Sequence, residues 1–186
     1  MTDNIENIIE GCRLKNPKAQ HLLYEQFSAR MYGVCLRYSG SVEDAQDVLH
    51  EGFLKIFEKI GQFQAKGAFE GWVRRIMVNT ALEKYRNRYK IINIQDNIIE
   101  AEQQGYEELA ENLTAHELMQ FIQELSPKYR LVFNLYAIEG YSHKEISTML
   151  NITEGTSKSN LFRARAILQE KVKKYYGNSI RTDISL

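Results

Sequence analysis

The sequence predicts an all-α protein with two small helical domains joined by a flexible acidic linker. Two observations lead to this prediction. Apolar residues recur at helical spacing through most of the 186-residue chain, which contains only two prolines. Between residues 93 and 115 this periodicity weakens and Gln, Asn and Glu dominate instead. We therefore expect domains at residues 1–92 and 116–177, a linker at 93–115 and a C-terminal tail at 178–186.

The composition, with 44% apolar and 26% charged residues, is typical of a soluble globular protein. No apolar run approaches the roughly 20 residues that span a bilayer, and the N-terminus lacks the basic and apolar regions of a signal peptide. We expect a cytoplasmic protein with no membrane insertion. Cys12 and Cys35 lie on apolar helix stripes, which indicates buried reduced thiols rather than a disulfide or a metal site. No metal or other cofactor is expected.

The formal net charge is zero, but the charges are segregated along the chain. Between residues 72 and 90 the basic residues outnumber the single acidic residue, Glu83, and the last helix is also basic. Residues 91–127 contain no Lys or Arg and are rich in Glu. Two basic blocks separated by an acidic stretch indicate two phosphate-facing surfaces joined by a segment that avoids the duplex.

Two helices are expected before residue 40. The first covers residues 4–13, and the second begins at the cap and first-turn pair Asn16-Pro17 and ends near Tyr38. Their apolar stripes consist of Ile5, Ile8, Ile9 and Cys12 in the first helix, and Leu22, Leu23, Phe27, Met31, Val34 and Cys35 in the second.

A third helix is expected to begin at Ser41, whose side chain can cap it. Its core stripe consists of Val48, Leu49, Phe53, Ile56, Phe57 and Ile60. Its other side presents a mainly acidic set: Asp44, Asp47, His50, Glu51 and Lys55. Acidic residues in a first turn also complement the helix dipole, so the residues alone leave open whether this face binds a partner. His50 has no second His or Cys one turn away, which argues against a metal site.

The segment 69–90 predicts a fourth helix with two chemically different faces. Its inner stripe consists of Phe69, Trp72, Val73, Ile76, Met77, Ala81 and Leu82. Its outer face combines cations, an amide and an aromatic ring: Arg74, Arg75, Asn79, Lys84, Tyr85, Arg86 and Arg88. Such a combination suits phosphates and unstacked bases. For Asn79 an alternative is a cap or bridge inside the helical bundle.

Helicity resumes near His116, is interrupted at Ser126-Pro127, and restarts from Tyr129 to Ile138. The segment 141–174 then predicts a helix-turn-helix.

In this helix-turn-helix, Ser142 and Glu145 form a capping box, Asn151 suits a left-handed turn, and Thr153 can cap the second helix. The second helix has an apolar stripe at Leu161, Ala164, Leu168 and Val172. Its other faces carry Lys158, Ser159, Phe162, Arg163 and Arg165. Such a helix can lie in the DNA major groove, and the plainer alternative is a helical hairpin with a solvated basic face.

Four segments resemble the extracytoplasmic-function (ECF) group of the sigma-70 family of RNA polymerase sigma factors. They occur in the order that a two-domain sigma factor requires: D-A-x-D-x-x-x-E-x-F at 44–53, F-x-x-W-[LV]-x-R-I-x-x-N at 69–79, a relative of L-P-x-x-x-R-x-V-F-x-L from residue 125, and G-T-x-K-S-x-x-x-R-A-R at 155–165. Three positions depart from the family pattern. His50 stands where Gln is common, Ser126 is added before Pro127, and Ser157 replaces a small aliphatic residue.

The resemblance implies a role for each surface. Asp44, Asp47, His50, Glu51 and Lys55 would bind core RNA polymerase at the beta-prime clamp helices. Arg74, Arg75, Asn79, Lys84, Tyr85, Arg86 and Arg88 would recognise the minus 10 element. Thr156, Lys158, Ser159, Phe162, Arg163 and Arg165 would read the minus 35 element. The implied partners are core polymerase, including its beta flap, promoter DNA and an anti-sigma factor.

The resemblance implies no enzymatic activity in this chain, because catalysis belongs to the polymerase. An alternative function is that of an autonomous helix-turn-helix regulator that binds DNA as a symmetric dimer. That alternative leaves the D-A-x-D surface without a role.

Overall fold

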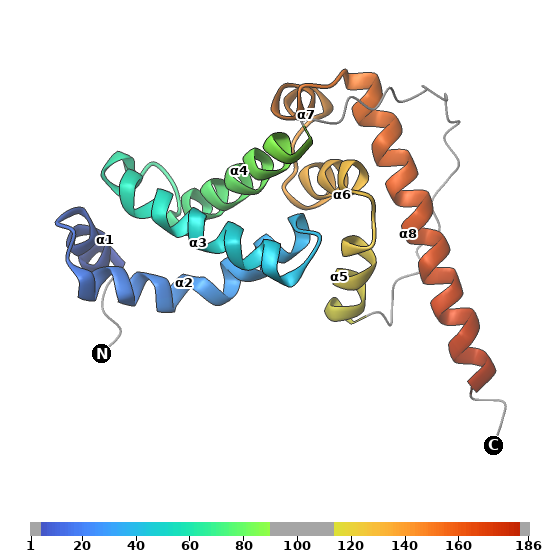
Figure 1. Ribbon diagram of the computed structural model, residues 1–186, viewed down its shortest axis with the longest axis horizontal. Helices are drawn as coiled ribbons and strands as arrows, with labels where there is room; N and C mark the ends of the chain where they lie inside the picture. The colour runs from blue at the N-terminus through green and yellow to red at the C-terminus, as the bar shows by residue number, and fades with distance from the viewer. Residues whose placement is uncertain (1–4, 90–113, 183–186) are drawn as a thin grey trace. The chain divides into compact units, whose positions relative to one another are not determined.

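The structure is a computed structural model that describes residues 5–89 and 114–182. The described secondary structure is entirely helical, which confirms the all-α prediction (Figure 1). The chain divides between Ile91 and Ile92 into two compact units. Almost all of the expected linker lies in residues 90–113, outside the described residues. The last four residues of the expected tail, 183–186, also lie outside them. None of the described helices is long and apolar enough to cross a membrane.

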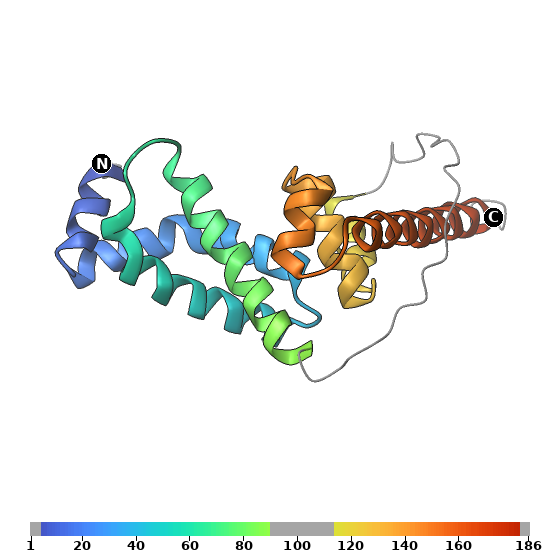
Figure 2. The ribbon, with the colours of Figure 1, turned by 90° about the horizontal axis from the view of Figure 1, so that it is seen from above.

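The N-terminal unit is a bundle in which α2, α3 and α4 pack against one another and α1 packs on α2 (Figure 2). Its elements are α1 (Ile5–Arg13), α2 (Pro17–Tyr38), α3 (Val42–Lys59), the short 3-10 turn η1 (Ile60–Gln62) and α4 (Phe69–Tyr89). The Asn16 side chain accepts a hydrogen bond from the Lys18 amide, and the Ser41 hydroxyl accepts one from the Asp44 amide. The predicted starts of α2 and α3 are therefore confirmed.

The core of this unit contains most of the side chains predicted to be buried. On α2 and α3 these are Leu23, Phe27, Met31, Val34, Cys35, Val48, Leu49, Phe53 and Ile56. On α4 the buried stripe differs from the prediction, because Val78 and Thr80 are buried whereas Trp72 and Ile76 are only half-buried. The stripe is wider because α4 packs against both α2 and α3.

A glycine in α3 lets α4 approach closely. A Cβ atom placed on Gly52 would lie 2.3 Å from the sulfur of Met77, which is fully buried in α4. The two helices therefore touch at this point. Beyond it, the basic C-terminal half of α4 runs beside the acidic N-terminal half of α3.

The C-terminal unit is organised around its long last helix, against which α5, α6 and α7 pack. Its elements are α5 (Ala115–Gln123), α6 (Pro127–Phe133), the π turn η2 (Asn134–Ile138), α7 (His143–Leu150) and α8 (Glu154–Thr182). The buried apolar side chains are Ile122, Leu125, Leu131, Val132, Leu135, Ile146, Leu161, Ala164 and Leu168. Helix α8 continues to Thr182, past the expected domain end at residue 177.

The capping chemistry predicted for the helix-turn-helix is present. Ser142 and Glu145 form a reciprocal capping box at the start of α7. Asn151 has φ 56° and ψ 49°, the left-handed conformation that ends α7. The Thr153 hydroxyl accepts a hydrogen bond from the Thr156 amide at 3.0 Å and so caps α8.

The end of α6 contains a π turn that the sequence analysis did not anticipate. The Glu139 amide donates to the carbonyl of Asn134, five residues earlier, at 3.0 Å. The fully buried Asn134 side chain donates from Nδ2 to the Arg130 carbonyl at 2.9 Å, which ties the widened turn to α6. Tyr136 lies in this turn, and its ring is directed at α7. Single π turns occur frequently at functional sites.

Candidate functional site

The acidic side of α3 holds the five residues predicted to bind polymerase. Four of them recur every three or four residues and so line one side of the helix: Asp44, Asp47, Glu51 and Lys55. His50, next to Glu51, lies at the edge of this line. The Asp47 side chain is 74% exposed. Asp44 and Lys55 are half-buried beside α4.

Two cations of α4 pair with this acidic side. The Lys84 ammonium lies 3.0 Å from Oδ2 of Asp47 and 3.4 Å from Oδ1 of Asp44. The Arg88 guanidinium donates to Oδ2 of Asp44 at 2.9 Å. Two residues predicted to contact DNA are thus engaged with two residues predicted to contact polymerase.

A second group of ion pairs is centred on Lys55. Its ammonium lies 2.8 Å from Glu51 on the same helix and 2.6 Å from Glu83 on α4. Burial alone would lower the pKa of Lys55, but the hydrogen bonds to Glu51 and Glu83 outweigh it and raise the pKa above its ordinary value. Lys55 is therefore a bridge between carboxylates rather than a solvated cation.

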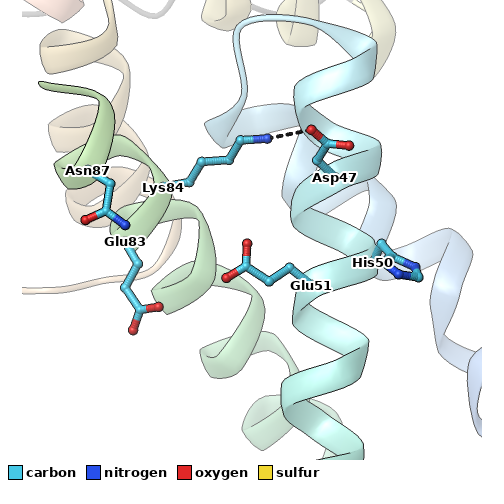
Figure 3. A pocket seen from close by; sticks show the side chains of 6 residues that line it. All are labelled: Asp47, His50, Glu51, Glu83, Lys84 and Asn87. Carbon is cyan, nitrogen blue, oxygen red and sulfur yellow. Dashed lines mark hydrogen bonds and ion pairs between the residues drawn. The ribbon is translucent and has the colours of Figure 1, made fainter.

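A pocket of about 350 Å³ lies between these charged side chains (Figure 3). Its lining comes from α3 and α4: Asp47, His50, Glu51, Glu83, Lys84 and Asn87. Within the described ranges, no three or more His, Cys, Asp or Glu side chains are grouped so as to hold a metal ion.

The predicted minus 10 set is divided between two sides of α4. Arg75, Asn79 and Arg86 are exposed, and their spacing places them on one face, about one and three turns apart. As far as the chain is described, none of the three makes an ion pair or a side-chain hydrogen bond. Lys84 and Arg88 face α3 instead.

The rest of that predicted set, Arg74 and Tyr85, is half-buried. The structure therefore leaves one exposed polar face on α4 that can meet a ligand without first breaking a contact within the unit.

The predicted minus 35 set is also divided, between neighbouring faces of α8. By spacing, Lys158, Phe162 and Arg165 share one face, and Thr156, Ser159 and Arg163 share the next. Lys158 is exposed, and the other five side chains are half-buried.

Both arginines of this set contact a tyrosine in the segment formed by α6 and η2. Arg163 donates to the hydroxyl of Tyr129 on α6 at 3.1 Å. The guanidinium of Arg165 lies 5.6 Å from the ring centroid of Tyr136 in η2. Arg163 is thus a packing contact within the unit as well as a predicted base reader.

Sequence reasoning missed a polar contact across the turn of the helix-turn-helix. Nδ1 of His143, the first residue of α7, lies 2.9 Å from Oγ of Ser157 on α8. The His143 ring stacks on Tyr136, with the ring centroids 4.6 Å apart. The unusual Ser157 was visible in the sequence, but spacing alone does not identify its partner.

The environment of His143 disfavours its charged form. Burial lowers the pKa of this imidazole, and the nearby cations Lys158 and Arg165 lower it further, against a weaker opposite effect of Glu154.

The fold and its charged surfaces define a two-unit helical protein with a helix-turn-helix in its C-terminal unit. The family model "Sigma-70 region 2" matches residues 23–91, and "Sigma-70, region 4" matches residues 115–168. These matches cover the helices that carry the three predicted surfaces.

Curated relatives support the same class. The ECF RNA polymerase sigma-E factor of Escherichia coli strain K12 is 30% identical over 185 residues, which cover 93% of this chain and 95% of that protein. SigW of Bacillus subtilis strain 168 is 28% identical, covering 79% of this chain and 85% of that protein. SigE of Mycolicibacterium smegmatis is 30% identical over 82% of this chain, which spans only 61% of that longer protein.

Among solved structures, the sigma factor RpoE of Bartonella quintana, crystallised with the anti-sigma factor NepR, has a similar fold. Its TM-score is 0.50 at 21% identity, covering 81% of this chain and 94% of that one. The chain belongs to the ECF group of the sigma-70 family of RNA polymerase sigma factors. The alternative of an autonomous regulator is not favoured.

Proposed function

We propose that this sigma factor docks on the beta-prime clamp helices of core RNA polymerase through the acidic side of α3. The observation that supports this proposal is that the two family models match, in order, the two units to which we assign the docking, minus 10 and minus 35 surfaces. Asp47 and Glu51 lie one turn apart with side chains 74% and 50% exposed, which supports their role as the main contacts. Asp44, His50 and Lys55 flank them.

The exposed face of α4 is the proposed minus 10 surface. Arg75 and Arg86 supply cations for phosphates, and the Asn79 amide carries both a donor and an acceptor for the edge of an unstacked base. Lys84 and Arg88 join this surface only if their ion pairs with α3 open.

The N-terminal half of α8 is the proposed minus 35 surface. Residues near the start of a recognition helix contact base edges in the major groove, and Lys158 is exposed there. Phe162 and Arg165 lie on the same face as Lys158. Thr156, Ser159 and Arg163 flank it.

Three further points complete the proposal. Catalysis resides in the polymerase, and this chain contributes promoter selection and strand opening through binding energy. It acts in the cytoplasm, where core polymerase and the chromosome are found. An anti-sigma factor is a further partner, by analogy with the B. quintana complex.

Reconstituted transcription tests this function. The purified chain is mixed with core RNA polymerase of the source bacterium and fragments of its genome, and transcripts are mapped at their 5′ ends. We expect co-purification with core enzyme and start sites that require the chain. A chain that binds duplex DNA as a symmetric dimer, ignores core enzyme and yields no new start sites would instead be an autonomous regulator.

A further inference from the structure

Three contacts in the C-terminal unit form a path that begins and ends on α8. The Ser157 hydroxyl meets Nδ1 of His143 at 2.9 Å. The His143 ring stacks on Tyr136, with centroids 4.6 Å apart and planes inclined by 22°. The Arg165 guanidinium lies 5.6 Å from the Tyr136 centroid. The path passes through α7 and η2 and returns to α8 about two turns from its start.

The first contact lies in the core. Ser157 is 0% exposed, so its hydroxyl requires a protein partner, and His143 supplies one. Either group can donate, depending on the imidazole tautomer. Loss of the imidazole would leave a buried hydroxyl without this partner, at the point where α8 begins to pack on α7.

The last contact bears on DNA recognition. Arg165 shares a face of α8 with Lys158 and Phe162. A guanidinium held over an aromatic ring has fewer conformations to lose on binding, so its contact with a base or phosphate costs less entropy.

We propose that His143 and Tyr136 are positioning residues for minus 35 recognition, which orient the recognition helix and the Arg165 side chain. This inference rests on the proposed function. It differs from the direct readout assigned to α8, because both residues act through Ser157 and Arg165 rather than through a DNA contact of their own.

The charges around the imidazole agree with this role. Lys158 and Arg165 approach from α8, and the Tyr136 ring that faces it from η2 is uncharged. Glu154 at the start of α8 acts in the opposite sense, but the net effect lowers the pKa of His143 and so favours its neutral form. A neutral imidazole can stack on Tyr136 without repelling the two cations.

The test uses the full chain in holoenzyme and a pool of promoter duplexes randomised over the minus 35 block, so that the preferred sequence need not be known. Tyr136→Leu removes the ring, whereas Tyr136→Phe keeps it as the matched control. His143→Ala and Ser157→Ala are tested singly and together. Enrichment at each base position, the salt dependence of binding and the melting temperature are measured for each variant.

We expect Tyr136→Leu and His143→Ala to lower minus 35 enrichment about tenfold, and the double His143–Ser157 variant to lose no more than the worse single variant. The Tyr136→Phe variant should enrich the same minus 35 sequences, to the same extent, as the unaltered chain. The slope of affinity against salt should not change, because the number of phosphate contacts is the same.

Two results would overturn the inference. One is normal enrichment by folded Tyr136→Leu and His143→Ala variants. The other is a loss of core binding, minus 10 function and melting temperature in parallel with enrichment, since a purely structural role predicts that pattern. If either variant fails to fold, Ser157→Ala tests the inference instead. For this variant the NMR chemical shift of the His143 imidazole and the minus 35 enrichment are measured. If the unaltered holoenzyme enriches no sequence, the proposed function itself fails.

Discussion

Lys84 of α4 and Asp47 of α3 form an ion pair at 3.0 Å. A side chain predicted to contact DNA is therefore paired with a side chain predicted to contact polymerase. Arg88 and Asp44 form a second such pair at 2.9 Å. Each pair has one exposed member, Asp47 at 74% or Arg88 at 66%, and ion pairs at the surface contribute only about 0–1 kcal/mol. Either pair can therefore open at little cost when a more strongly interacting partner arrives.

Charge reversal of the docking pair tests the α3 surface. Asp47→Lys combined with Glu51→Lys should abolish holoenzyme formation, because it reverses the charge presented to the clamp. The melting temperature should change little, because the two replaced carboxylates are 74% and 50% exposed. Co-purification with core enzyme measures the effect.

Lys84→Ala is the matched control for this experiment. It breaks the same ion pair but leaves the Asp47 carboxylate, so polymerase binding should persist. Normal core binding by the double-Lys variant would show that the surface is misassigned.

Lys158 offers a cleaner test of base reading than Arg163, whose bond to Tyr129 would be lost as well. Lys158→Ala should cost about 1–3 kcal/mol and relax preference at particular minus 35 positions if this side chain meets a base edge. Lys173→Ala, further along the exposed side of α8, should weaken binding to all DNA sequences evenly and lower the slope of affinity against salt by about one. Identical profiles for the two variants would make Lys158 a phosphate anchor.

Close packing of α3 on α4 predicts a glycine effect. Gly52→Ala should destabilise the N-terminal unit by about 1–3 kcal/mol, because the new Cβ would overlap the Met77 sulfur. Gly33→Ala in α2 is the control, since its Cβ would meet no atom within 4 Å, and it should stabilise by about 0.5–1 kcal/mol. Denaturant unfolding of the intact chain measures both. Equal stabilities would mean that α3 and α4 are not in contact at this glycine.

The lowered pKa of His143 predicts a pH dependence of stability. Its pKa lies below the ordinary 6.5 in the folded chain, so the unfolded chain binds more protons in the interval between the two values. The contribution of the neutral His143 imidazole to the free energy of unfolding is therefore present above pH 6.5 and is lost as the pH falls through the folded pKa. His143→Gln should flatten this part of the melting profile, and a histidine titration by NMR should give a midpoint below 6.5. A midpoint above 6.5 would contradict the burial of this ring.

Several features of the fold could be predicted from the sequence because they depend on local chemistry. Ser41, Ser142 and Asn151 cap or end helices through groups only a few residues away, and the apolar stripes follow the helical period. The cap on α5 was missed, although Thr114 and Glu117 carry the same S/T-x-x-E signal.

The division of the site residues could not be predicted in this way. Whether Lys84 faces DNA or Asp47 depends on which side of α4 packs against α3, and that is a tertiary contact. The π turn at Asn134 likewise depends on a buried amide. In retrospect, a lone Asn inside the apolar run V-F-N-L was the available signal.

Asn79 gives the sharpest test of strand opening. It is exposed, and no described residue bonds its side chain, which favours base reading over the alternative of a cap or bridge inside the bundle. Asn79→Ala should therefore keep its fold and core-polymerase affinity but lose transcription from duplex promoters. A pre-melted bubble template should rescue it only in part, because the contact to the unstacked base is itself missing.

Val78→Ala, at the neighbouring buried position, provides a structural control: it leaves a cavity in the core, so it should lower the melting temperature and affect all functions together. If Asn79→Ala behaved in that way, Asn79 would be structural. A stable Asn79→Ala chain with full activity on a duplex promoter would remove Asn79 from the minus 10 surface, and Arg75 and Arg86 would then contribute phosphate contacts alone.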